Sequence, residues 1–177
     1  MIPKYFFLTK GEGKHKDYLH SFELSLRDAG IQHLNIVQVS SIVPPTCKQV
    51  SKEQGLKMLK PGEITFAVLD INSTDEPQKT ITSSIGVALP PNKRDYGYIA
   101  EHHSSERKKV TEEFVEELAS TMLTTALGIH IDADKSWKTR KELLVAKGIT
   151  TFNITQSSEG TNDSLWRTVI AAAVFIL

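Results

Sequence analysis

The stretch that decides the fold of this chain runs from Leu34 to Pro45 and reads LNIVQVSSIVPP. It overlaps a β-branched, largely apolar run, Ile31 to Ser40, which predicts a buried strand. Pro44–Pro45 lacks main-chain N–H groups, so it ends any strand ladder that reaches it. The two neighbouring hydroxyls of Ser40–Ser41 therefore fall where a strand gives way to a rigid turn.

Two helices are predicted on either side of this stretch. Apolar residues recur at helical spacing between Lys16 and Asp28, and Gly30 follows as a C-terminal stop. The segment Ser105–Leu127 is a second helix, capped by Gly128. The glutamates of this helix are predicted to lie outside. Its apolar side is predicted to carry five large residues: Val110, Phe114, Leu118, Leu123 and Leu127. Residues 46–62 are predicted to form a loop or a short helix.

Further strands are predicted where apolar runs lie between turn residues. They cover Glu63–Ile71, Thr80–Leu89, Tyr96–His102, Ile149–Thr155 and Ser164–Leu177. Several of them follow one another across short turns, without a strict alternation of strand and helix. We therefore predict an α+β fold, an α/β sandwich of mostly antiparallel sheet layers with flanking helices, in a single domain over 1–177.

Composition and charge exclude several classes of function. Lys plus Arg and Asp plus Glu both number 21, and this balance argues against nucleic-acid or membrane-surface partners. Cys47 is the only cysteine, which excludes an internal disulfide and a cysteine-rich zinc site. We find neither a signal-peptide core nor a membrane-spanning run, so we expect a cytoplasmic protein that acts on a small molecule.

The pair Ser40–Ser41 can carry chemistry as well as structure. A serine hydroxyl can attack the carbonyl of the preceding peptide, and elimination from the resulting ester leaves a residue that hydrolyses to a pyruvoyl ketone. Such a ketone forms a Schiff base with an amine and serves as the electron sink that pyridoxal phosphate supplies elsewhere. The plain structural interpretation is that both hydroxyls cap a turn. A second pair, Ser83–Ser84, lies mid-strand without an immediate proline turn, so we interpret it as structural.

The run LNIVQVSSIVPP resembles the processing segment of the pyruvoyl-dependent arginine decarboxylase family. Three other pieces resemble that family in the same order, and together they extend from about residue 19 to the C-terminus. They are LHSFELSLRDAGI (Leu19–Ile31), SSIGVALPPNKRDYGYIAEHH (Ser83–His103) and the Ala-rich end VIAAAVFIL (Val169–Leu177).

This resemblance assigns roles to individual residues. It implies that Ser41 becomes the pyruvoyl group and that Ser40 ends a β chain of residues 1–40, leaving an α chain of residues 41–177. Asn35 assists this processing, Glu101 protonates the substrate carbanion, and Glu23 binds the guanidinium group. The family pattern has aspartate where this chain has Glu23, and the extra methylene leaves the substrate less certain than the reaction. The expected cofactor is the covalent pyruvoyl group alone, without pyridoxal phosphate or metal.

The residues themselves bear on two of these roles. A carboxylate within the apolar run that precedes Glu101 is expected to be partly buried, which raises its pKa and suits a proton donor, although an ordinary ion pair fits equally. Glu23 borders the apolar face of its predicted helix. This position fits a guanidinium-binding residue, but it also fits an ordinary solvated residue of a surface helix. The adjacent His102 and His103 point to opposite faces of a strand and cannot easily share a metal ion.

If residues 35–41 form a regular strand, Asn35 and Ser41 lie about 20 Å apart. A single chain cannot then bring both to one reacting centre, whereas two copies can. The resemblance likewise implies a homotrimer, or a dimer of trimers, with sites between subunits.

The predicted activity is the conversion of arginine to agmatine and carbon dioxide, a step of arginine metabolism and polyamine biosynthesis. Three alternatives stay open: a decarboxylase of another amino acid, a non-processing binding or regulatory homologue, and a thiol hydrolase that uses Cys47.

Overall fold

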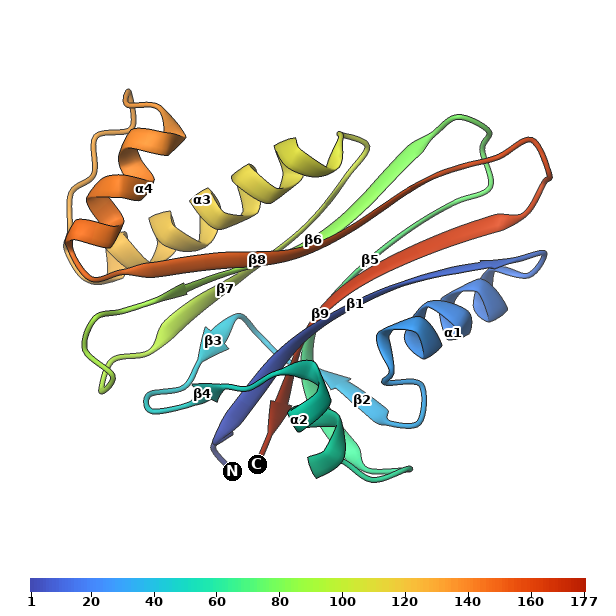
Figure 1. Ribbon diagram of the computed structural model, residues 1–177, viewed down its shortest axis with the longest axis horizontal. Helices are drawn as coiled ribbons and strands as arrows, with labels where there is room; N and C mark the ends of the chain where they lie inside the picture. Colours follow the sequence, from blue (N-terminus) through green and yellow to red (C-terminus); the bar gives the residue numbers. More distant parts are fainter.

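The apolar run at the C-terminal end forms strand β9 (Trp166–Ile176), which is buried along most of its length. The computed structural model describes residues 1–177 and places β9 at the centre of a five-stranded sheet (Figure 1). The strand order is β2 (Asn35–Gln38), β5 (Ile64–Thr74), β9, β1 (Tyr5–His15) and β4 (Lys48–Gln49). The long strands β1 and β5 pair antiparallel with β9, whereas the short edge strands β2 and β4 join parallel to their neighbours.

A four-stranded antiparallel sheet packs against the first sheet. Its order is β3 (Ile42–Val43), β7 (Gly97–Ser104), β6 (Thr80–Leu89) and β8 (Thr150–Glu159). Alternate residues of both sheets point inward and form the central core. Its buried members include Phe6, Val68, Ile85, Ile99 and Phe175.

Helices cover the two outer faces of the pair of sheets (Figure 1). The five-stranded sheet carries α1 (Tyr18–Ala29) and α2 (Lys52–Met58), and the four-stranded sheet carries α3 (Lys108–Ala126) and α4 (Trp137–Ala146). The resulting order of layers is helix, sheet, sheet, helix. This confirms the predicted α+β sandwich of mostly antiparallel sheets with flanking helices.

Two glycines allow the helices to approach the sheets closely. A Cβ atom at Gly13 would collide with the main-chain carbonyl oxygen of Ser21 in α1. A Cβ atom at Gly86 would collide in the same way with the carbonyl oxygen of Val115 in α3. Because main-chain atoms cannot rotate away as a long side chain can, both positions require a residue without a side chain.

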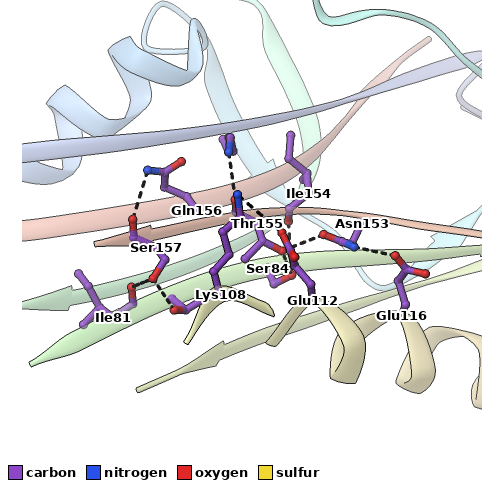
Figure 2. Close-up of polar contacts among 12 residues, drawn as sticks. Ile81, Ser84, Lys108, Glu112, Glu116, Asn153, Ile154, Thr155, Gln156 and Ser157 are labelled. Atoms are coloured by element: carbon purple, nitrogen blue, oxygen red, sulfur yellow. Dashed lines mark hydrogen bonds and ion pairs between the residues drawn. The ribbon is translucent and has the colours of Figure 1, made fainter. Parts of the chain in front are cut away.

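The predicted buried face of α3 is confirmed for Leu118, Leu123 and Leu127, which pack on the core, but is wrong at its N-terminal half. Val110 and Phe114 are exposed, and smaller residues face the sheet instead, among them Thr111, Val115 and Ala119. The close approach at Gly86 favours small side chains over large ones. Glu116 is also buried, rather than outside as predicted. It accepts hydrogen bonds from Thr151 and Asn153, the second of which is visible in Figure 2, and it pairs with Lys141.

Several element boundaries also differ from prediction. The strand predicted over Ile31–Ser40 is shorter, because only β2 is in the ladder, and its residues are mostly exposed. Strand β1 was not predicted, since its second half alternates Gly with charged residues and resembles a loop. Residues 46–62 hold both β4 and the short helix α2. The ends of α1 and α3 are confirmed, because Gly30 and Gly128 adopt left-handed φ values of 80° and 67°.

Candidate active site

The chain passes from one sheet to the other at Ser40–Ser41. The N–H of Val39 still donates to the carbonyl oxygen of Ala67 in β5, at 3.0 Å. Two residues later, the carbonyl oxygen of Ser41 accepts from the N–H of Ile99 in β7, at 2.8 Å. Ser40 is therefore the only residue between the last hydrogen bond to the five-stranded sheet and the first to the four-stranded sheet.

This crossing corrects the premise that residues 35–41 form a regular strand. The ladder of β2 ends at Gln38, and the chain then turns at Ser41 into β3, which pairs with β7. The chain must turn here because the two sheets are separate layers, and Pro44–Pro45 then ends β3 after Val43. A straight-strand estimate of the separation between Asn35 and Ser41 therefore does not apply.

The hydroxyl groups of Ser40 and Ser41 make no hydrogen bond within the chain, whereas those of the second serine pair are engaged. Ser83 Oγ donates to Asp70 Oδ2 at 2.5 Å. Ser84 Oγ lies 2.6 Å from Thr155 Oγ1 (Figure 2). Both residues lie mid-strand in β6 and are buried, which confirms the structural interpretation of Ser83–Ser84.

Glu101 lies on β7 close to the crossing. The register that sets Ile42 opposite Tyr98 puts Ser41 opposite Ile99, two residues before Glu101. Alternate residues of a strand share a face, so Ile99 and Glu101 belong to one face of this sheet, and Ser41 joins the strand at Ile99 through the bond to its carbonyl oxygen. It is the face that packs against the five-stranded sheet, where Ile99 is fully buried.

The surroundings of Glu101 favour its protonated form. Partial burial raises the pKa of this carboxyl group above its usual value, and the negative charge of Asp70 raises it further. Asp70 itself is buried on β5 and accepts hydrogen bonds from Ser83 Oγ and from the N–H of Ser84. A raised pKa increases the fraction of this carboxyl group that holds a proton, which suits a proton donor.

The two histidines after Glu101 face opposite ways, as predicted. His102 packs on Phe114 of α3, with ring centroids 4.5 Å apart. His103 lies on the other face of β7 and contacts Asp70.

Asn35 and Glu23 do not contact Ser41 within the chain. The side-chain amide of Asn35 donates to the carbonyl oxygen of Gly62, at 2.8 Å. Glu23 lies on α1, on the outer face of the five-stranded sheet (Figure 1). One of its oxygens, Oε1, accepts from Arg27 Nε at 2.5 Å, whereas Oε2 is buried and accepts no hydrogen bond.

An apolar hollow of about 330 Å³ opens beside Ser40. Val39, Ile42, Phe66 and Phe175 are among the residues that line it. Exposed apolar side chains continue around this hollow and along the edge strand β2: Met1, Ile2, Val37, Ile42, Ile64 and Leu177. The crossing segment therefore borders an apolar surface that the chain itself leaves open.

Cys47 does not have the surroundings of a nucleophile. Burial raises the pKa of its thiol to about 11, so the reactive thiolate is scarce at neutral pH. The chain gives it no hydrogen bond to a histidine, and a thiol hydrolase would need such a partner.

None of the helices is both long enough and apolar enough to span a lipid bilayer.

Comparison with known proteins matches almost the whole chain to one family. The family model described as pyruvoyl-dependent arginine decarboxylase matches residues 5–177. A probable pyruvoyl-dependent arginine decarboxylase of Chloroherpeton thalassium is 51% identical over 99% of this chain and 98% of its own length. Pyruvoyl-dependent arginine decarboxylase 2 of Methanosarcina mazei is 50% identical, with the same coverage. These matches confirm the resemblance inferred from the four sequence pieces.

Proposed function

The chain belongs to the pyruvoyl-dependent arginine decarboxylase family, and from that premise we propose that it cuts itself between Ser40 and Ser41 and then decarboxylates arginine to agmatine. Enzymes of this kind use a covalently bound pyruvoyl group in place of pyridoxal phosphate. Cleavage divides the single domain into a β chain of residues 1–40 and an α chain of residues 41–177. The observation that carries this proposal is the position of Ser40, alone between the last hydrogen bond to the five-stranded sheet, at Val39, and the first to the four-stranded sheet, at Ser41.

The residues around Ser41 fit a covalent pyruvoyl group at that position. The hydrogen bond from Ile99 N–H reaches the carbonyl oxygen of Ser41, on the C-terminal side of the proposed cut, so it remains after cleavage. Val43 and Ile99 are buried near it and give this carbonyl group an apolar flank. When present, the group supplies a ketone that binds the substrate amine and withdraws electrons as carbon dioxide leaves.

Glu101 acts as the general acid in this proposal. It returns a proton to the substrate Cα after carbon dioxide has left, and the upward shift of its pKa favours the protonated form that this role needs. The register between β3 and β7 supports this role, because Glu101 lies two residues beyond Ile99, whose N–H donates to the Ser41 carbonyl oxygen.

Glu23 binds the substrate guanidinium group. Its Oε2 atom accepts no hydrogen bond and lies 3.9 Å from His20 Nε2, so once uncovered it can accept from a guanidinium group without loss of the existing bond from Arg27. A guanidinium group matches a carboxylate with charge-assisted hydrogen bonds, which makes arginine the best-fitting substrate. Lysine, ornithine or aspartate is the alternative, because Glu23 stands where the family pattern has aspartate.

The active unit is a homotrimer or a dimer of trimers, with each site shared between subunits. Three observations support this assembly: Ser41 lacks a side-chain partner in its own chain, Glu23 and Asn35 do not contact it, and an open apolar surface borders it. Asn35 of one copy then assists cleavage in another. We also propose a cytoplasmic location for this assembly.

Mass spectrometry of freshly purified protein tests the cleavage. The wild-type protein should give two polypeptides, the larger with a pyruvoyl end, while Ser41→Ala should give one chain of 19.7 kDa. Ser84→Ala is the matched control and should still be cut, because that hydroxyl is engaged in β6. Two fragments from Ser41→Ala would refute the processing site, and an uncut wild-type chain would instead favour a non-catalytic homologue.

Substrate choice and site sharing need separate assays. Release of carbon dioxide should be fastest from arginine among arginine, lysine, ornithine and aspartate. A faster release from another of these acids would identify that acid as the substrate.

For the shared site, Ser41→Ala and Glu23→Ala chains are expressed together. Each retains the residue that the other lacks, so mixed trimers should regain activity if the two residues come from different subunits, and should stay inactive if they come from one.

A further inference from the structure

A single hydrogen bond closes the turn at the proposed cleavage site. The N–H of Ile42 donates to the carbonyl oxygen of Ser40, at 2.9 Å. A bond between residues two apart defines a γ-turn, and the negative φ of its central residue, Ser41, makes it the inverse form. Of the main-chain hydrogen bonds outside helices and strands, this is the only one that spans two residues.

This N–H group has no role in the sheet. Ile42 lies opposite Tyr98, and the neighbouring bond in the ladder runs from Ile99 N–H to the Ser41 carbonyl. Antiparallel ladders alternate, so the N–H of Ile42 points away from β7. Its only partner is the carbonyl group that self-cleavage must attack.

We propose that the main-chain N–H of Ile42 stabilises the oxyanion that forms on Ser40 during self-cleavage. The inference rests on the proposed function, since it concerns how the cut is made. The N–H lies 2.9 Å from the carbonyl oxygen of the uncut chain, which is the atom on which the negative charge develops. The turn therefore positions the susceptible carbonyl and its stabilising donor with three consecutive residues.

The step conserves every atom and electron. Ser41 Oγ attacks the carbonyl carbon of Ser40, and the carbonyl π electrons move to the oxygen that accepts from Ile42. The hydroxyl proton passes to the nitrogen of Ser41 as the C–N bond breaks and the carbonyl re-forms. The product is an ester between Ser40 and Ser41 Oγ with a free amino group, an isomer of the starting chain, so this step needs no co-reactant.

Removal of this N–H tests the proposal. Ile42→Pro lacks the donor yet breaks no ladder bond, whereas the control Ile42→Ala keeps the donor and loses only the side chain. Chains are made by cell-free synthesis, and the uncut fraction is followed by mass spectrometry. Loss of one oxyanion donor typically costs roughly 100- to 1000-fold in rate, so Ile42→Pro should be cut that much more slowly than Ile42→Ala.

A second variant separates loss of the donor from the effects of proline, which restricts the conformation of Ser41. Replacing Ile42 by the α-hydroxy acid with the same side chain exchanges the N–H for an ester oxygen and adds no ring. Folding of each variant is checked by circular dichroism in a Ser41→Ala background.

Slow cleavage in the α-hydroxy acid variant supports the proposal whether or not Ile42→Pro folds. If the α-hydroxy acid variant is cut at the rate of Ile42→Ala, the role of the Ile42 N–H is overturned, while the proposed function is unaffected. A wild-type chain that never cleaves would overturn the proposed function instead.

Discussion

The Nδ1 atom of His103 lies 3.0 Å from Oδ1 of Asp70. This contact links the two sheets, and it lies on the face of β7 that also carries Glu101. Asp70 is buried, and its other oxygen accepts from Ser83 Oγ and Ser84 N–H. These donors replace water around a carboxylate that would be costly to bury alone. The cluster therefore holds a negative charge where it acts on the proposed proton donor.

Asp70→Asn should move the pH dependence of kcat. Glu101 must be protonated to act as an acid, so kcat falls as the pH rises through the pKa of Glu101. Removing the charge of Asp70 lowers that pKa, and the alkaline limb should shift to lower pH. Burial, the larger cause of the raised pKa, remains, so the shift should be partial.

Ser83→Ala is the control for Asp70→Asn, because it removes a hydrogen bond to Asp70 but leaves the charge. Its alkaline limb should stay near that of the wild type. If the alkaline limb of Asp70→Asn stays at the wild-type pH, Asp70 does not influence the pKa of the proton donor.

Glu101→Gln should separate self-cleavage from turnover. The amide has nearly the same shape but cannot donate an acidic proton, so kcat should fall by roughly 100- to 10,000-fold. The chain should still separate into two polypeptides on a denaturing gel, since the proposed cut uses no atom of Glu101. The exposed Glu113 of α3 provides the control, and Glu113→Gln should keep the wild-type kcat. Full activity in Glu101→Gln would assign the proton donor elsewhere.

Glu23→Gln should weaken arginine binding more than it slows the chemistry. Loss of a charge-assisted hydrogen bond costs about 1.5–3 kcal/mol, which corresponds to a KM for arginine that is roughly 10- to 150-fold higher. Steady-state kinetics would show this change with kcat much less affected. Glu53→Gln, an exposed substitution on α2, should leave KM unchanged. A wild-type KM in Glu23→Gln would exclude this residue from the guanidinium site.

Gly86→Ala should destabilise the fold, because a Cβ atom there meets the main chain of α3. Overpacking of this kind costs about 1–3 kcal/mol. Urea unfolding in the Ser41→Ala background, where the chain stays in one piece, measures this cost without interference from cleavage. Lys109→Ala, on the exposed side of α3, should change stability by less than about 0.5 kcal/mol. Equal midpoints for the two variants would contradict the close approach of α3 to β6.

The sequence predicted those elements whose pattern is local. Strand β6 was predicted with its observed bounds, Thr80–Leu89, because turn residues lie on both sides of an apolar run. Strand β1 was missed because Gly11 and Gly13 suggest a loop, and their purpose becomes clear only against α1. Helix α4 was missed because it is mostly exposed and has little apolar periodicity.

The candidate site likewise has parts that the sequence predicts and parts that only the folded chain reveals. Ser40–Ser41 and the proline turn can be recognised in the sequence, but the proximity of Glu101 depends on the register between β3 and β7. No local pattern fixes which residue of one strand lies opposite a residue of another. Asp70 was not predicted at all, because it reaches this region from the opposite sheet.

The pairing of β1 with β9 has a consequence for the mature enzyme. Eleven residue pairs, from Tyr5 opposite Ile176 to His15 opposite Trp166, would join two separate polypeptides once the chain is cut. The short polypeptide would then supply an interior strand, enclosed by neighbours from the long one. Thermal denaturation of the cut protein would become a dissociation, with recovery on cooling dependent on concentration, whereas the uncut precursor could regain its fold as a lone molecule.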